Sequence, residues 1–355
     1  MAAMNGSVVS FRGHGRLIAC CTAVALMLAA FVIAPAGASA QPAPAGPVYL
    51  ALGDSISFGY SEQKFNENYP TESPARFEEG FDHWFNKDLG KSFKGITDVN
   101  LACPGETSNG LIGENEMLGG KTSTEPTSPP ALYQGLGDWH PCAYHNVDGF
   151  PLHAGYGSLS QLEDAVSILT ENNKITGKPN EVKAITLNIG SNDELAQIKQ
   201  CEVEHGSEGK AAVLACVSYS AVHITIPHIL ANLGDTLGVL DTYYSGPIIL
   251  LGYYNPDTFI LPSSDELQEG ANKAVVEDIL PYFPNVTLAN PFPVFNKDAG
   301  IKASVEKAAI CKYTEMCNTN DPGGSEGDGD IHPTAKGYKE LAKLVNAAYQ
   351  ANPAK

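Results

Sequence analysis

"LALGDSISFGY", residues 50–60, is an apolar run that ends directly at Gly53, Asp54 and Ser55. Short apolar runs bounded by glycine are typical of buried β-strands. In a parallel α/β sheet, reactive groups gather just beyond the carboxyl ends of the strands. The stretch therefore predicts a strand over residues 47–52 with the hydroxyl of Ser55 at its carboxyl end.

Four further short runs of β-branched or aliphatic residues have the same character, at residues 97–102, 183–189, 247–252 and 286–289. Helical patterns lie between and after them. Ser160 and Glu163 have the spacing of a capping box at the start of one helix, and residues 334–351 repeat the helical period. Strands that alternate with helices predict an α/β protein with a mostly parallel, five-stranded sheet covered on both faces.

The composition describes an ordinary globular protein. The chain has 355 residues, of which 43% are hydrophobic and 17% are charged. Its 22 Lys and Arg against 40 Asp and Glu give a net charge of −18, which argues against a nucleic acid as partner. We interpret the acidic balance as a source of solubility, and we expect a monomer.

The first forty residues have the pattern of a secretory signal. Arg12 and Arg16 precede an apolar run over 17–34, and small residues follow up to Ala40. We expect cleavage before Gln41, which leaves a mature domain over 41–355 without a stable membrane anchor. The alternative is an uncleaved anchor, since a run of this length can just span a bilayer.

Export changes how the cysteines are interpreted. Removal of Cys20 and Cys21 with the signal leaves six cysteines. An even number outside the cytosol indicates three disulfides, whereas the absence of a CxxC motif disfavours zinc. Fifteen pairings are possible for six cysteines. Pairing sequence neighbours gives Cys103–Cys142, Cys201–Cys216 and Cys311–Cys317.

A serine hydroxyl becomes a nucleophile when a base takes its proton and donors stabilise the oxyanion that forms. "NLACPGETS" at 100–108 offers the backbone N–H of Gly105, and "TLNIGSNDE" at 186–194 offers the carboxamide of Asn192. "DGDIHPTAKGY" at 328–338 offers a base, His332. Pro333 is a candidate first residue of the final helix, and Asp193 is a candidate cap of the helix after the third strand.

These four blocks, in this order, resemble the GDSL or SGNH hydrolase family of ester hydrolases. The resemblance covers the layout of residues 46–350 and implies a flavodoxin-like, three-layer α/β/α sandwich. We expect no cofactor and no metal, since the histidines do not have a metal-ligand spacing. It implies that Ser55 is the nucleophile and His332 the general base. The backbone N–H groups of Ser55 and Gly105 and the side chain of Asn192 would then form the oxyanion hole.

The sequence departs from the family pattern at one position. The family places its triad aspartate three residues before the histidine, where this chain has Gly329. Asp330 and Asp328 flank that position. Three alternatives stay open for the group that orients His332: Asp330, Asp328, or a backbone carbonyl that leaves a Ser–His dyad.

The substrate is the least determined feature of the sequence. The family resemblance favours a lipid or lipid-like ester, with an acetylated polysaccharide or a non-catalytic binding role as alternatives. A long insertion over 106–157 is a candidate lid. Aromatic residues in the insertions line an acyl groove or belong to the core beneath long loops: Tyr69, Phe77, Phe81, Trp84, Phe85, Trp139, Tyr144, Phe150 and Tyr156.

Overall fold

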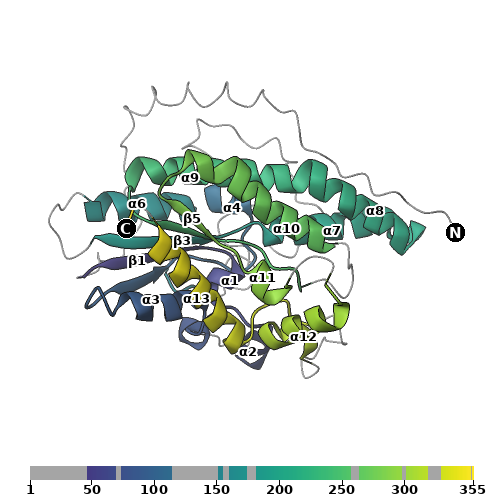
Figure 1. Ribbon diagram of the computed structural model, residues 1–355, viewed down its shortest axis with the longest axis horizontal. Coiled ribbons are helices and arrows are strands. Elements are labelled where there is room, and N and C mark those ends of the chain that lie inside the picture. Colours follow the sequence, from purple (N-terminus) through teal and green to yellow (C-terminus); the bar gives the residue numbers. More distant parts are fainter. Residues whose placement is uncertain are drawn as a thin grey trace. The chain divides into compact units, whose positions relative to one another are not determined.

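A five-stranded parallel sheet forms the centre of the computed structural model (Figure 1). The structure describes residues 46–68, 73–113, 151–154, 160–173, 181–256, 264–297, 301–318, 329–352 and 354–355. Each strand overlaps one of the runs identified in the sequence, so the α/β prediction is confirmed. The strands are β1 (Val48–Gly53), β2 (Thr97–Asn100), β3 (Val182–Asn188), β4 (Ile248–Leu251) and β5 (Val286–Ala289).

The strand order is β2-β1-β3-β4-β5, which is the flavodoxin-like order. The chain passes from β1 to one side to form β2, and then to the other side to form β3. In such sheets a crevice opens where the order reverses, at the carboxyl ends of the strands. Here β1 and β3 flank that crevice, with Gly53 paired to Asn188.

Gly53 is required by the close approach of β1 and β3. Its φ is 128°, and a Cβ built on it would lie 1.9 Å from the backbone oxygen of Asn188. Any other residue would force the two strand ends apart. Gly53 therefore fixes the end of β1, and with it the place of Ser55 two residues later.

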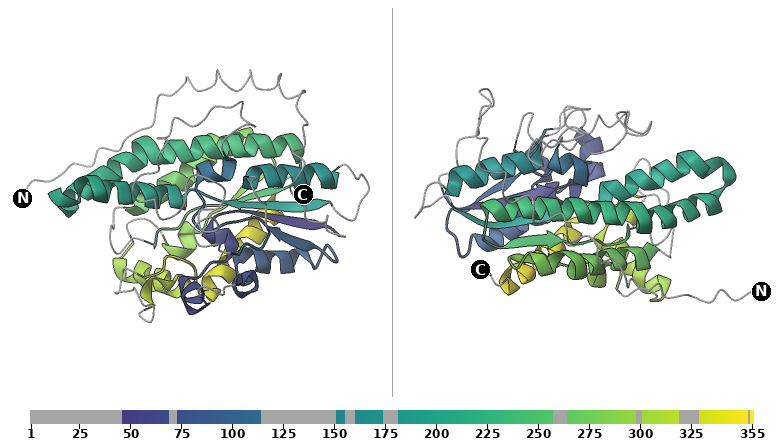
Figure 2. Two further views of the ribbon diagram at one scale, coloured as in Figure 1. Left: turned by 180° about the vertical axis from the view of Figure 1, so that it is seen from behind. Right: turned by 90° about the horizontal axis from the view of Figure 1, so that it is seen from above.

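Helices cover both faces of the sheet, which gives three layers (Figure 2). The helices that pack on one face are α4 (Ser108–Ile112), α6 (Gln161–Asn173) and α9 (Ile226–Tyr243); those on the other are α3 (Phe81–Leu89), α12 (Ala303–Tyr313) and α13 (Ala335–Ala351). The remaining α-helices are α1 (Ser55–Phe58), α2 (Glu62–Asn68), α7 (Ser191–His205), α8 (Lys210–Ser220), α10 (Ser264–Ala274) and α11 (Phe292–Phe295).

Short 3₁₀ and π segments join several of these helices. The 3₁₀ segments are η2 (Pro74–Phe77), η3 (Gly206–Glu208), η7 (Leu280–Tyr282) and η8 (Glu315–Cys317), and the π segments are η4 (Ala221–Thr225) and η6 (Val275–Ile279). Because η4 joins α8 to α9 without a break, residues 210–243 form one long helix.

The core lies on both sides of the sheet, because β1 alternates between the two faces. Leu50 and Leu52 pack with the α4, α6 and α9 layer, whereas Tyr49 and Ala51 pack with the α3 and α13 layer. All six residues of β1 are buried. A strand buried on both faces has a nearly continuous apolar sequence, which explains the run that ends at Gly53.

The aromatic residues of the early insertion that the structure describes belong to the core. Phe77, Phe81 and Phe85 are buried, and Trp84 packs against the cluster formed by α3 and α13. The acyl-groove interpretation is wrong for these four residues, because their rings fill space beneath the helices. The other aromatic residues lie outside the described residues: Tyr69, Trp139, Tyr144, Phe150 and Tyr156. So do residues 114–150 of the candidate lid.

One predicted helix start is confirmed. The N–H of Ser160 donates to Glu163 Oε2 at 2.8 Å, and the N–H of Glu163 donates to Ser160 Oγ at 3.1 Å. This reciprocal pair is the expected capping box.

Two other helix assignments from the sequence were wrong. The final helix begins at Ala335 and is capped by the Thr334 hydroxyl, while Pro333 forms a β-bridge with Thr314. The helix after β3 is preceded by Gly190 as its N-cap residue, without a side-chain cap. Asp193 instead accepts hydrogen bonds from Ser108, because its carboxylate points from α7 towards α4.

Two of the expected cysteine pairs are disulfides in the structure. Cys201–Cys216 joins α7 to α8, with 5.7 Å between the Cα atoms. Cys311–Cys317 joins α12 to η8, with 5.1 Å between the Cα atoms. Cys142, the expected partner of Cys103, lies outside the described residues, as do the expected signal over 1–40 and its boundary at Gln41.

Candidate active site

Ser55 is the first residue of α1 and follows β1 after a single intervening residue. That residue, Asp54, caps α1 by accepting the N–H of Ile56 at 2.9 Å. The short turn from strand to helix places the Ser55 hydroxyl at the carboxyl edge of the sheet. Ser55 is 8% exposed, so its hydroxyl is largely shielded from solvent.

His332 approaches Ser55 from the opposite end of the chain. Its Nε2 lies 2.8 Å from Ser55 Oγ, and its Nδ1 is hydrogen-bonded to Asp330 Oδ1. The Asp330 side chain is 2% exposed and also accepts the N–H of His332 and the N–H of Glu62, both at 3.0 Å. The three side chains form a continuous hydroxyl, imidazole and carboxylate chain.

Asp330 is the group that the structure brings to the second ring nitrogen of His332. Asp328, the second candidate from the sequence, lies outside the described residues. Position 329 has no room for a side chain, because a Cβ there would lie 2.6 Å from the backbone oxygen of Met316. A glycine therefore stands where the family pattern has its aspartate, and the next residue supplies the carboxylate.

Burial and charge oppose each other in the histidine–aspartate pair. Burial alone lowers the pKa of His332, but the negative charge of Asp330 and its hydrogen bond outweigh burial, so this pKa lies above its ordinary value. Burial alone raises the pKa of Asp330, but the charge and hydrogen bonds of His332 outweigh it and lower this pKa. The pair of His332 and Asp330 thus favours an ionised carboxylate beside a basic imidazole.

Burial raises the pKa of Asp54, the residue before Ser55, to about 7.

The loop that carries His332 is held by backbone bonds. The N–H of Glu315 donates to the His332 carbonyl at 2.9 Å, and the N–H of Thr334 donates to the Tyr313 carbonyl at 2.9 Å. The Tyr254 hydroxyl donates to the carbonyl of the preceding residue, Ile331, at 2.8 Å. The Cys311–Cys317 disulfide closes the segment that provides Glu315.

Asn192 is hydrogen-bonded to the backbone of Glu106, the residue after Gly105. Asn192, in the first turn of α7, donates from Nδ2 to the carbonyl of Glu106 at 2.8 Å. This bond fixes the carboxamide next to the residue that follows Gly105. Asn192 lines the same pocket as Ser55.

Gln161 is a positioning residue that the sequence analysis did not identify. It is fully buried, its Oε1 accepts the N–H of Gly53 at 2.9 Å, and its Nε2 donates to the Gly53 carbonyl at 2.8 Å. Nε2 also donates to Glu106 Oε2 at 3.0 Å. The helical period places residue 161 on the same face as Ala165, so a glutamine on an apolar face was the available signal.

A pocket of about 650 Å³, its open mouth included, lies beside Ser55. Its polar lining residues are Ser55, Asn188, Ser191, Asn192, Glu194 and Gln268. Its apolar wall contains Ile56, Leu195, Ile198, Leu251, Tyr253, Tyr254, Pro256 and Ile331.

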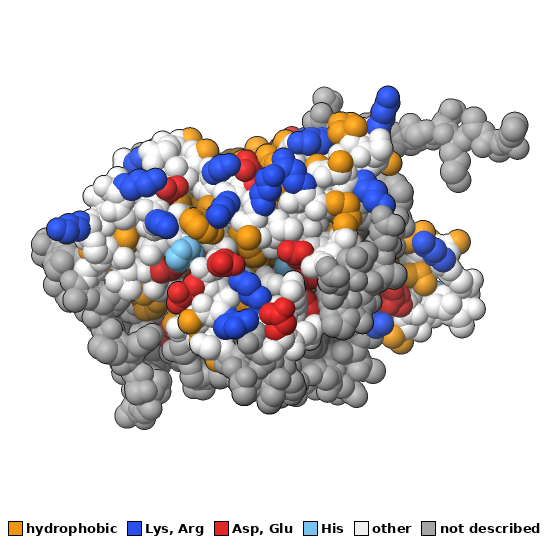
Figure 3. Space-filling view, turned by 90° about the horizontal axis from the view of Figure 1, so that it is seen from below, with side chains coloured by type: hydrophobic (Ala, Val, Ile, Leu, Met, Phe, Trp, Pro, Cys, Tyr) orange, Lys and Arg blue, Asp and Glu red, His pale blue; other side chains and the backbone are white. Residues whose placement is uncertain are grey.

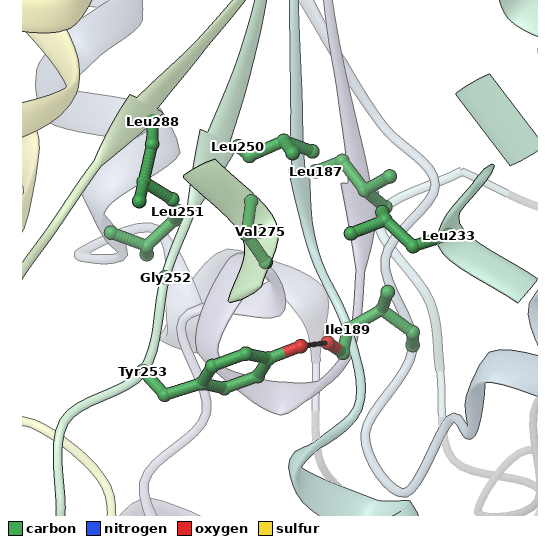
Figure 4. A pocket seen from close by; sticks show the side chains of 9 residues that line it. All are labelled: Leu187, Ile189, Leu233, Leu250, Leu251, Gly252, Tyr253, Val275 and Leu288. Atoms are coloured by element: carbon green, nitrogen blue, oxygen red, sulfur yellow. Dashed lines mark hydrogen bonds between the residues drawn. The ribbon is translucent and has the colours of Figure 1, made fainter. Parts of the chain in front are cut away.

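Tyr253 lines this pocket and also a small apolar cavity deeper in the core (Figure 4). Its hydroxyl donates to the Ile189 carbonyl at 2.8 Å, which holds the ring at the residue that follows β3. The other walls of the deeper cavity are aliphatic: Leu187, Ile189, Leu233, Leu250, Leu251, Val275 and Leu288, with Gly252. Leu251, Gly252 and Tyr253 therefore line both spaces.

Glu204, His205 and Cys216 lie close enough to share a metal ion. The sulfur of Cys216 is bonded to Cys201, so it does not offer a thiolate ligand. The arrangement lies at the far end of α7 from Asn192 and carries no argument for a metal in the pocket.

Comparison with known proteins gives one family. Residues 49–345 match the profile of the GDSL-like Lipase/Acylhydrolase family. No curated protein sequence matches the chain.

Solved structures with a similar fold include lipases and an esterase. A lipase from a goat rumen metagenome is 16% identical, with 85% of this chain and 96% of that one covered and a TM-score of 0.44. An extracellular lipase from Streptomyces rimosus is 15% identical, with 85% and 99% covered and a TM-score of 0.45. A carbohydrate esterase family 2 enzyme from Corynascus thermopiles (Myceliophthora fergusii) is 14% identical, with 89% and 68% covered and a TM-score of 0.42. At these TM-scores none of the likenesses bears on the substrate.

We predict that Gln161→Met lowers the free energy of unfolding by about 1–3 kcal/mol, because it removes the acceptor of a buried N–H. The chosen measurement is urea unfolding followed by circular dichroism. Gln63→Met, on the exposed face of α2, is the control and should have no such effect. Equal stability of the two variants would contradict the role assigned to Gln161.

Proposed function

The chain belongs to the GDSL-like lipase/acylhydrolase family and is a carboxylic ester hydrolase, and from this premise we propose that Ser55, His332 and Asp330 form its catalytic triad. The observation that supports the proposal is the 2.8 Å contact between His332 Nε2 and Ser55 Oγ, with Asp330 on the other ring nitrogen. A nucleophile, a base and a group that orients the base are the parts that acyl transfer needs.

The reaction proceeds in two half-reactions. His332 Nε2 takes the proton of Ser55 while Oγ attacks the ester carbonyl carbon, and the tetrahedral intermediate collapses as His332 protonates the leaving alcohol. Water then attacks the acyl-serine, giving its proton to His332, which returns it to Ser55 as the acid leaves. Asp330 keeps the Nδ1–H tautomer and stabilises the imidazolium that forms in each half-reaction.

The oxyanion of each intermediate is stabilised by three donors: the N–H groups of Ser55 and Gly105 and the carboxamide of Asn192. Two of these residues, Ser55 and Asn192, line one pocket. The hydrogen bond from Asn192 to Glu106 supports the proposal, since it keeps the carboxamide beside Gly105.

The substrate class that fits the pocket is a lipid or lipid-like ester. The acyl chain would lie against the apolar wall between α7 and the segment that follows β4, with its carbonyl at Ser55. Tyr253 would limit the chain length. An acetyl group alone would leave most of this wall in contact with water.

We also propose that the protein is exported as a monomer after loss of residues 1–40. The disulfides Cys201–Cys216 and Cys311–Cys317 support export, because such bonds persist in oxidising compartments.

Asn192→Ala tests the oxyanion assignment. Removing one preorganised donor lowers turnover by about 10²–10³-fold, so we expect this loss in kcat for p-nitrophenyl butyrate. Asn66→Ala, on the exposed part of α2, is the matched control and should retain wild-type turnover. Wild-type kcat in a folded Asn192→Ala protein would refute the assignment.

The pH profile tests the pair of His332 and Asp330. His332 accepts a proton only when neutral, so kcat/KM should fall as pH drops through a midpoint above about 6.5, the ordinary histidine pKa. In Asp330→Asn the charge that raises this pKa is absent, so the midpoint should move to lower pH. Turnover should fall by up to about 10⁴-fold, the loss seen for the equivalent change in a serine protease.

The exposed Asp241→Asn is the control for this profile and should leave midpoint and turnover unchanged. An Asp330→Asn protein with the wild-type profile would show that another group orients His332.

The role of Tyr253 is tested with esters of different acyl length. Tyr253→Leu joins the pocket to the deeper cavity, so we expect the ratio of kcat/KM for p-nitrophenyl decanoate to that for the butyrate to rise about tenfold. Tyr253→Phe keeps the ring and should retain the wild-type ratio. If Tyr253→Leu leaves the ratio unchanged, the acyl chain does not reach this residue.

A further inference from the structure

The long helix over 210–243 has an unusual charge pattern. Between Lys210 and Asp235 the chain contains no Asp, Glu, Lys or Arg, although the protein as a whole carries a net charge of −18. The helix is long and apolar enough to cross a membrane by length and composition, yet only 22% of its most apolar window is buried in the protein. An uncharged surface of this length requires an explanation.

The second half of this helix belongs to the core. Leu233, Leu237 and Leu240 of α9 are buried against the sheet together with α4 and α6. Because these residues hold α9 in the fold, the helix does not cross a membrane in this structure. The part left to explain is the first half, α8 and η4.

Exposed apolar side chains gather on this first half and on its neighbour α7. Tyr219 is 63% exposed and Ile224 is 54% exposed. Of the seven large apolar side chains exposed among the described residues, four lie between residues 191 and 225: Leu195, Val203, Tyr219 and Ile224. We call the exposed surface of residues 211–225, in α8 and η4, the hairpin face; besides Tyr219 and Ile224 it contains Ala211, Ala215, Ser218 and His223.

The hairpin face and one wall of the pocket that contains Ser55 belong to the same pair of helices. The helices α7 and α8 form a hairpin that projects from the end of the sheet at which α1 lies (Figures 1 and 2). The disulfide Cys201–Cys216 ties them together, and counting back along the antiparallel helices sets Tyr219 level with Ile198. Ile198 and Leu195 of α7 line the pocket. The hairpin that carries the hairpin face therefore also contributes a wall of the pocket.

The distribution of charge on the protein indicates which kind of surface binds the hairpin face. Figure 3 shows many Lys and Arg side chains, with Asp and Glu among them, on the face seen from below. Lys87 of α3 and Lys339 of α13, in the layer below the sheet, are exposed. An anionic surface would be attracted to that layer, on the other side of the sheet from α9. The hairpin face itself has no Asp, Glu, Lys or Arg, although the exposed Lys210 lies next to it at the start of α8.

We propose that the hairpin face adsorbs to the surface of neutral or zwitterionic lipid aggregates and brings the pocket of Ser55 to the lipid. Burial of exposed Tyr and Ile side chains in the acyl boundary favours adsorption, and an uncharged face loses no ionic hydration there. The delivery of substrate rests on the proposed function, whereas adsorption itself does not.

The test measures binding to phosphatidylcholine vesicles by flotation, in a Ser55→Ala background that prevents hydrolysis of the vesicles. Replacement of both hairpin residues (Tyr219→Asp and Ile224→Asp) should lower the partition coefficient at least about tenfold. The matched control changes two exposed apolar residues elsewhere, Val276→Asp and Tyr282→Asp, and should bind as before.

Three results would overturn the proposal: undiminished binding of the hairpin variant, an equal loss in the control, or wild-type binding to anionic vesicles alone. A wild-type dimer that the hairpin substitutions dissociate would also overturn it, because the face would then bind a second copy. Only variants that keep the native circular dichroism spectrum and the Cys201–Cys216 disulfide are compared, so unfolding does not account for a loss of binding.

Hydrolysis of a soluble ester separates this proposal from the proposed function. With Ser55 restored, the hairpin variant should hydrolyse p-nitrophenyl acetate at the wild-type rate and emulsified long-chain esters at least about tenfold more slowly. A wild-type protein that binds vesicles but hydrolyses no ester would refute the proposed function and leave adsorption standing. One that hydrolyses the soluble ester but binds no vesicles would refute adsorption alone.

Discussion

The close approach of β1 and β3 at Gly53 is the constraint on which the candidate site depends. The absence of a side chain there lets the backbone of β1 meet that of Asn188, and Gln161 fixes both polar groups of the same glycine. Ser55 follows two residues later, and Asn192 follows β3 by one short turn. The relative position of hydroxyl and carboxamide is therefore set by the sheet rather than by a loop, which suits preorganised groups.

The imidazole of His332 reaches the carboxyl edge of the sheet from a loop. The position of this loop depends on the charge of Asp330 and on backbone hydrogen bonds. The buried carboxylate of Asp330 accepts three hydrogen bonds, two of them from His332 and one from Glu62 at the start of α2. A buried carboxylate without such donors would be protonated and would not hold the imidazole. The same bonds thus orient His332 and keep Asp330 ionised.

The sequence predicted the parts that follow from periodicity and from short motifs. The five strands and the capping box at Ser160 depend on local patterns. The contacts that depend on a loop path were not predictable: the choice of Asp330, the bond of Asp193 to Ser108, and the clamp formed by Gln161. Pro333 illustrates the limit, because its bridge to Thr314 comes from a distant segment and overrides the usual helix-start preference.

Fluorophosphonate labelling followed by mass mapping tests the central claim most directly, because the reagent reports an activated serine and not merely an exposed one. The account predicts a single label on Ser55, lost in Ser55→Ala and strongly slowed in His332→Ala. A folded protein that hydrolyses esters while its label lies on another residue, or that labels equally fast without the imidazole, would contradict the account.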